Sequence, residues 1–209
     1  LAPMFVIMSF SYGLAVFILV LMASYAWSNR PLGDGLLYRL KNLLGVFIAA
    51  VLYFVLVYHL TNLYATEHHG VERFILMEGG IYTALFWIVQ IGLGSLLPLA
   101  MIYHPRIGKS RPAIATACAL VIIGGFAQLY VLLIGGQAYP LDMFPGYEVT
   151  SSFFDGVVAS YRPSIWEITL GVGGIALALL IVQVAARVLR FLPDTLEDSA
   201  IDPHAAKAD

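Results

Sequence analysis

One helical turn in the second apolar segment carries three polar side chains. Tyr58 and Asn62 are four residues apart and His59 and Asn62 three apart, so a helix places all three on one side. Glu67 follows roughly two turns after His59, and Glu78 precedes the next apolar segment. An imidazole that titrates near neutral pH, beside a carboxylate leading to water, suits the protons that accompany quinone chemistry. These five residues predict a quinone or proton pocket, and a purely structural hydrogen bond from His59 to a neighbouring helix is the alternative.

A second group of polar residues lies deeper in the apolar segments or at the start of the last one. Polar and ionisable groups are costly within hydrocarbon and often functional there. Ser164 stands three residues before Glu167, which is a capping-box pattern, so capping of a helix is an equal alternative for Glu167. The group predicts a proton path through Gln90, Gln128, Tyr130 and Glu167.

The sequence gives little support for a haem site, a metal site or catalysis by this chain alone. A b-type haem usually needs two axial histidines on facing helices, and His59 alone is well placed inside an apolar segment. The adjacent His68 and His69 stand beside Glu67 and Glu72, but neighbouring helical residues face different ways and nothing else completes a metal shell. The single cysteine, Cys118, excludes an intrachain disulfide and a Cys-rich iron–sulfur site. We therefore expect no metal, no cofactor bound by this chain and no catalysis by the chain alone.

The elements that must position these residues are five long apolar segments. Hydrophobic residues make up 60% of the chain and charged residues 11%, which excludes an ordinary soluble domain. Each segment is long enough to cross about 30 Å of hydrocarbon as a helix. We expect an all-α integral membrane protein, with one bundle over residues 1–193 and an acidic, mobile cytoplasmic tail over 194–209. The predicted spans are roughly 3–27, 43–65, 80–103, 113–137 and 165–191.

The basic residues predict an orientation. Alternate connections and the end of the last span hold most of them, whereas the other connections are mainly acidic. The positive-inside rule then places the N-terminus outside and the C-terminus in the cytoplasm. The outside loop 138–164 is rich in aromatic residues, which predicts an ordered lid or docking surface. The basic residues expected to face the cytoplasm in the connections are Arg30, Arg39, Lys41, Arg106, Lys109 and Arg111.

The start of the chain favours a piece of a longer protein. Leu1-Ala2-Pro3 has no initiator methionine and leads at once into an apolar span. A cleaved signal peptide is the alternative. We expect this chain to be the C-terminal part of a longer membrane protein.

Residues 57–80 (VYHLTNLYATEHHGVERFILMEGG) and 135–174 resemble the NrfD family, the polysulfide-reductase-type membrane subunits, and within it the DsrP type of sulfur-metabolism complexes. The resemblance covers essentially the whole chain but only the C-terminal portion of such proteins. The family's best-described quinone site lies in the N-terminal portion, so no quinone ligand is carried over to this chain.

The resemblance implies a membrane anchor without cofactors in a multi-subunit oxidoreductase of the bacterial cytoplasmic membrane. Such a subunit exchanges electrons between quinone, as substrate, and an iron–sulfur, ferredoxin-like partner. Clusters and haem belong to partner subunits, which include cytochromes and other membrane subunits. A proton- or solute-translocating bundle without a redox role is the main alternative, and a b-type cytochrome is the third. The sequence shows no basic face that would indicate a nucleic-acid partner.

Overall fold

The computed structural model describes residues 2–140, 156–189 and 192–201. In these residues five helices or helical runs are long and apolar enough to cross a membrane, which confirms the predicted all-α fold with five spans. The second span begins at Asp34 rather than near residue 43, because residues 34–42 continue its helix. The orientation in the membrane stays a prediction. The spans are α1 (Ala2–Trp27), α2 (Asp34–Tyr64), Ile81–Tyr103, Arg111–Ala138 and α8 (Ile165–Val188).

The chain divides into two compact units. Unit 1 comprises Leu1–Ile18 and Leu40–Tyr161, and unit 2 comprises Leu19–Arg39 and Arg162–Asp209. Most of the predicted site residues belong to unit 1, and Glu167 belongs to unit 2. The predicted lid over 138–164 falls largely on residues 141–155, which lie outside the described part of the chain.

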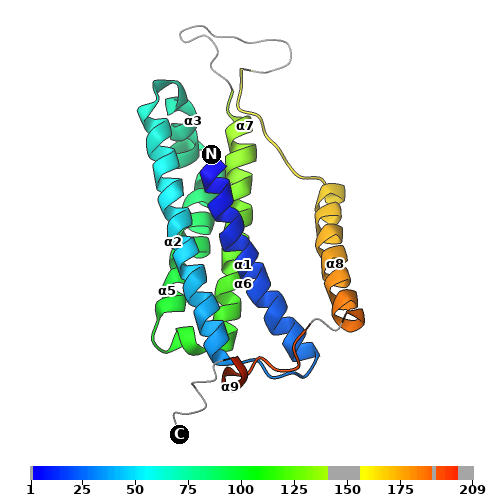
Figure 1. Ribbon diagram of the computed structural model, residues 1–209. Helices are drawn as coiled ribbons and strands as arrows, with labels where there is room; N and C mark the ends of the chain where they lie inside the picture. Colours follow the sequence, from blue (N-terminus) through cyan, green and yellow to red (C-terminus); the bar gives the residue numbers. More distant parts are fainter. Residues whose placement is uncertain (1, 141–155, 190–191, 202–209) are drawn as a thin grey trace. The chain divides into compact units, whose positions relative to one another are not determined.

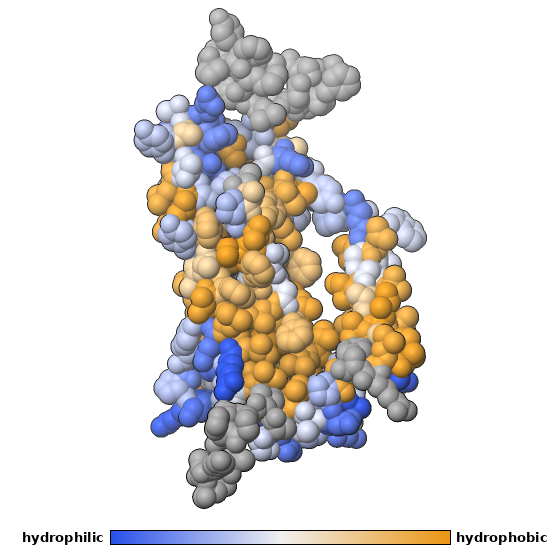
Figure 2. All heavy atoms as spheres, in the orientation of Figure 1, coloured by the Kyte–Doolittle hydropathy of each residue, from blue (hydrophilic) through white to orange (hydrophobic). Residues whose placement is uncertain are grey.

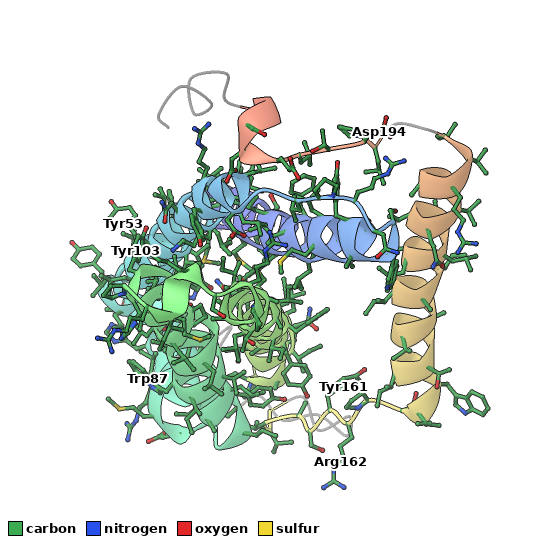
Figure 3. The ribbon with its side chains drawn as sticks, turned by 90° about the horizontal axis from the view of Figure 1, so that it is seen from below. Tyr53, Trp87, Tyr103, Tyr161, Arg162 and Asp194 are labelled. Carbon is green, nitrogen blue, oxygen red and sulfur yellow. The ribbon has the colours of Figure 1, made fainter. Side chains whose placement is uncertain are left out.

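In unit 1 the first half of α1 packs with α2 and with the third and fourth spans (Figure 1). On the face shown in Figure 2, hydrophobic side chains cover the middle of this unit, and hydrophilic residues lie toward both ends. Tyr53, Trp87 and Tyr103 project outward (Figure 3) and are exposed. The core around the site contains Met4, Met8, Val51, Val55, Phe74, Ile75, Tyr82, Phe86, Val131 and Ala138.

The third and fourth spans contain wide, π-helical turns next to the predicted polar residues. The third span runs through α4 (Ile81–Ala84), η3 (Leu85–Leu96) and α5 (Leu97–Tyr103), and the fourth through α6 (Arg111–Leu129), η5 (Tyr130–Gly135) and α7 (Gly136–Ala138). Both η3 and η5 are π-helical, and such turns often occur at functional sites. Gln90 lies in η3, and Gln128 lies just before η5.

The third and fourth spans cross at two glycines. A Cβ atom on Gly94 would collide with the Cα atom of Gly124, and one on Gly124 would collide with Gly94. Since backbones approach this closely only without side chains, the two glycines set the crossing. The crossing brings Gln90 and Gln128, which lie near these glycines in sequence, to the same part of the bundle.

The connection between the second and third spans consists of three short helices. They are η1 (Thr66–His68), α3 (His69–Arg73) and the π-helical η2 (Phe74–Glu78). Phe74 and Ile75 are buried in the core and hold the connection against the bundle. Gly80 follows with a φ of +55°, a conformation that favours glycine and lets the chain enter the third span.

In unit 2 residues 192–198, which include the first residues of the predicted tail, contact Arg30 and the start of α2. The Gly35 N–H donates to Oδ1 of Asp198 at 2.9 Å, and the Arg30 guanidinium donates to the carbonyl of Leu192 at 2.6 Å. A short helix, α9 (Asp198–Ile201), ends the described chain. Residues 202–209 of the predicted tail are outside the described part.

Candidate functional site

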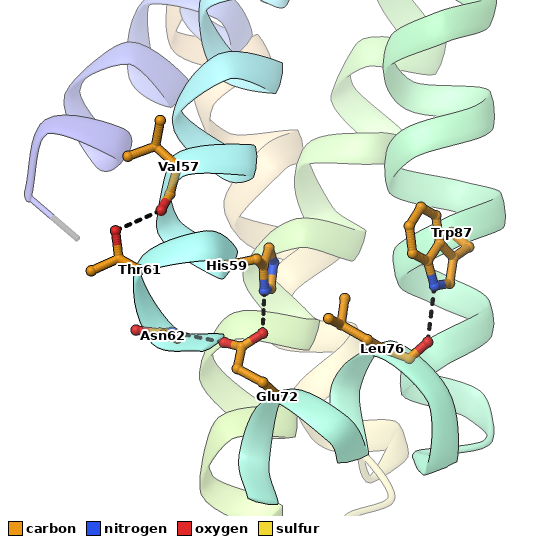
Figure 4. A network of polar contacts seen from close by, with 7 residues as sticks. All are labelled: Val57, His59, Thr61, Asn62, Glu72, Leu76 and Trp87. Atoms are coloured by element: carbon orange, nitrogen blue, oxygen red, sulfur yellow. Dashed lines mark hydrogen bonds and ion pairs between the residues drawn. The ribbon is translucent and has the colours of Figure 1, made fainter. Parts of the chain in front are cut away.

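A buried carboxylate joins α3 to α2 in unit 1. The Glu72 side chain is 1% exposed and that of His59 is 12% exposed. Oε2 of Glu72 lies 2.6 Å from Nδ1 of His59, and Oε1 accepts a 2.7 Å hydrogen bond from Nδ2 of Asn62 (Figure 4). Both oxygens of the carboxylate therefore bond to side chains from one turn of α2.

Two aromatic rings hold the imidazole in place. The His59 ring packs edge-on against Phe86, with centroids 4.8 Å apart, and against Tyr58 at 5.2 Å. Phe86 comes from the third span, so the ring is held between two helices. Since Nδ1 faces Glu72, the other ring nitrogen, Nε2, lies on the far edge of the imidazole.

This pair can store or pass one proton. With one proton between them, the groups form either an imidazolium–carboxylate ion pair or a neutral pair, and the 2.6 Å contact lets the proton move between them. Uptake or loss of a further proton would leave a net charge in a water-poor interior, which is costly without a partner. A proton will therefore tend to move on, as a relay requires.

The structure brings Tyr58, His59 and Asn62 together, as their spacing predicts. Glu72 rather than Glu67 takes the carboxylate position, because the connection turns Glu72 inward and leaves Glu67 exposed. Glu78 is also exposed, and its Oε1 pairs with Arg73 at 2.7 Å on the surface. A helix places residues three apart on one side, so Glu72 shares a face with the apolar residue Ile75. This spacing is the signal in the sequence that could have identified Glu72 as a buried carboxylate.

The deeper residues separate into an interior pair and two others. Gln90 and Gln128 are both buried and line the same two small cavities. Oε1 of Gln128 accepts a 2.6 Å hydrogen bond from the hydroxyl of Tyr12, a residue that the sequence interpretation missed. Tyr130 stacks on Tyr82, with ring centroids 5.9 Å apart.

Glu167 begins α8 in unit 2, where it forms the predicted capping box. Its Oε2 accepts from the Ser164 N–H at 2.6 Å, and its own N–H donates to Oγ of Ser164 at 3.3 Å. The capping interpretation therefore has direct geometric support, whereas a relay role for Glu167 stays a prediction.

Among the residues that the structure describes, no group of three or more His, Cys, Asp or Glu side chains could hold a metal ion. His68 and His69 are exposed, and the His69 ring contacts the carbonyl of Leu63 through Nε2 at 2.5 Å. The buried contact between Glu72 and His59 is of a kind that can exchange a proton.

Comparison with known proteins places the chain in a family. Residues 1–140 match the family model described as polysulphide reductase, NrfD. Over 203 residues the chain is 26% identical to the Hdr-like menaquinol oxidoreductase integral membrane subunit of Archaeoglobus fulgidus, which covers 96% of this chain and 51% of that protein. Over 174 residues it is 26% identical to a subunit of the selenate reductase of Mesobacillus selenatarsenatis, covering 82% of this chain and 39% of that protein.

The chain thus spans about half or less of the length of these relatives. No solved structure matches it. Because the family model covers most of the sequence and five apolar helices accompany it, the chain is a multi-pass membrane protein that belongs to the NrfD family.

Proposed function

We propose that this chain is a membrane subunit of a quinone-linked redox complex and that Glu72 and His59 handle the protons of the quinone reaction. Family membership and relatives named as subunits of a menaquinol oxidoreductase and a selenate reductase support the complex. The buried contact between Glu72 and His59 is the observation that carries the proton role.

Quinol oxidation explains why a base is needed. A quinol that becomes a quinone loses two electrons and two protons, and the electrons pass to a redox partner. In this proposal the partner is an iron–sulfur subunit that the chain anchors, with cytochrome and other membrane subunits in the same complex. The protons need acceptors inside a medium that disfavours charge, and an imidazole bonded to a carboxylate is a suitable one.

The cavity beside His59 limits what the pair does. Its volume is about 10 Å³, whereas sites for small organic ligands usually have about 300–1,000 Å³. The quinone ring therefore does not bind in this cavity, and we assign the pair to proton exchange rather than to quinone binding. Gln90 and Gln128 would continue the proton path inward, and Tyr130 and Glu167 stay predicted members of it.

The complex purified from membranes tests the proposal. Glu72→Gln keeps the shape of the side chain and removes its charge, so we expect quinone-linked turnover to fall by about 100-fold or more, in the range of lost acid–base catalysis. Glu78→Gln is the matched control, since that carboxylate is on the surface of the same connection. Equal turnover in the two assembled variants would overturn the proton role.

Co-purification tests the complex itself. We expect an iron–sulfur subunit to remain bound through mild detergent extraction. If the chain instead purifies without any redox subunit and moves protons or a solute in vesicles, the alternative of a translocating bundle without a redox role is correct. A bacterial cytoplasmic membrane and a sulfur-compound reaction belong to the same proposal, and the partner subunits that are recovered would identify them.

A further inference from the structure

One buried amide nitrogen lacks a hydrogen-bond partner in the part of the chain that the structure describes. Nε2 of Gln128 is enclosed and donates no hydrogen bond, while Oε1 of the same side chain accepts one from the Tyr12 hydroxyl. The Tyr12 ring reaches this place because residue 125 is glycine: a Cβ atom there would come within 2.7 Å of the ring. If the amide were turned over, its oxygen would lack a partner instead, so one polar atom is unsatisfied in either orientation.

Such an atom is unusual, because nearly all buried polar groups in proteins are hydrogen-bonded to protein or to ordered water. Within a membrane no bulk water is at hand to complete the bonding. Gln128 is 3% exposed, so the partner must be a small molecule enclosed in the bundle.

Two cavities adjoin this amide, and both are lined by Gln90 and Gln128. The first also reaches Tyr58 and His59, and the second reaches the Tyr12 side of Gln128. Each has a volume of about 10 Å³, which is close to the space that one water molecule requires.

We propose that the cavity between His59 and Gln128 holds an ordered water molecule that bonds the imidazole to the Gln128 amide. Dry cavities are apolar, whereas four polar side chains line this one: Tyr58, His59, Gln90 and Gln128. Two to four polar partners are what a buried water requires.

The bound water would extend the proposed proton path beyond His59, and this role rests on the proposed function. With Nδ1 of His59 facing Glu72, the water gives the other edge of the imidazole a second partner. A proton that reaches His59 from Glu72 then has an onward acceptor inside the bundle, and the Gln128 amide and the Tyr12 hydroxyl orient that acceptor. The binding of the water itself does not depend on quinone chemistry.

Hydroxyl-radical labelling by brief X-ray irradiation tests the water directly, because radicals formed from a bound water oxidise the side chains beside it. Met4 and Met8 are a matched pair: both lie on α1, and they are 3% and 2% exposed. Met4 lines the cavity beside His59, and Met8 is not among the residues lining either cavity. In the resting complex without quinol, we expect Met4 to be oxidised at least fivefold faster than Met8.

Equal labelling of Met4 and Met8 in the wild-type complex would overturn the proposal. A second measurement uses Gln128→Met, which keeps the length of the side chain and removes the amide. In that variant the rate at Met4 should fall to that at Met8, while buried Cys118, which lines neither cavity, keeps its rate. An unchanged Met4 rate in Gln128→Met would also contradict the assignment. Since no turnover is measured, failure here is distinct from failure of the redox function.

Discussion

Two carboxylates on one short connection have opposite surroundings. The Glu72 side chain is 1% exposed and bonds to His59 and Asn62, whereas that of Glu78 is 56% exposed and pairs with Arg73, itself 70% exposed. A surface pair of this kind contributes about 0–1 kcal/mol to stability. Removing one partner of a buried pair costs about 3–5 kcal/mol, because the other is left unpaired. Burial, rather than residue type, distinguishes the candidate proton site from its surface counterpart.

The short helices of the connection produce this difference. In α3 and η2, the face that carries Glu72 and Ile75 is buried, and Arg73 is exposed. The core residues Phe74 and Ile75 hold that face against the bundle. The same packing that buries apolar surface therefore brings the carboxylate to His59.

The largest expected effect follows from removing the buried carboxylate. Glu72→Ala leaves His59 and Asn62 without their shared partner, so we expect the complex to lose about 3–5 kcal/mol of stability. Thermal unfolding of the purified complex measures it, with Glu78→Ala as the control. A loss of equal size in the two variants would remove the distinction between the buried and the surface carboxylate.

A smaller effect is expected at Asn62, which supplies one of the two bonds to Glu72. Asn62→Leu leaves Oε1 of the carboxylate unsatisfied, and a lost bond of this kind costs about 1–3 kcal/mol. Thr61 on the same turn is the control, because its hydroxyl is exposed and donates to the Val57 carbonyl of its own helix. Thr61→Val should change the unfolding temperature little. If Asn62→Leu lowers the unfolding temperature as little as Thr61→Val does, the hydrogen bond from Asn62 to Glu72 does not stabilise the protein.

The smallest effect is expected at the surface pair. Glu78→Gln removes the charge that faces Arg73, so stability should fall by no more than about 1 kcal/mol. The loss should shrink further as salt is raised, because exposed charges are screened. Unfolding curves at low and high salt check this. A loss above about 2 kcal/mol that is insensitive to salt would show that the pair is not a simple surface contact.

The sequence predicted the features that depend on local pattern. Hydropathy gave the five spans, helical spacing brought His59 and Asn62 together, and the Ser164 pattern indicated the cap at Glu167. The start of α2 was placed too late, because polar residues at a helix end resemble a connection in the sequence.

The features that the sequence did not reveal depend on tertiary packing. Glu72 was considered only beside a pair of loop histidines. Its spacing to Ile75 indicates that the two share a helix face, but no local pattern shows that this face folds back on α2. The hydrogen bond from Tyr12 to Gln128 joins helices that are far apart in the sequence. It depends on Gly125, which a sequence pattern marks only as a small residue that permits close packing.

The pH dependence of quinone-linked turnover in His59→Gln tests the central claim most directly. Glutamine can still hydrogen-bond to Glu72 but does not take up a proton near neutral pH. We expect the assembled variant to turn over at least tenfold more slowly and to show a flatter dependence of rate on pH than the wild-type complex. Unchanged turnover with an unchanged pH profile would contradict the account and leave His59 as a structural bond between α2 and α3.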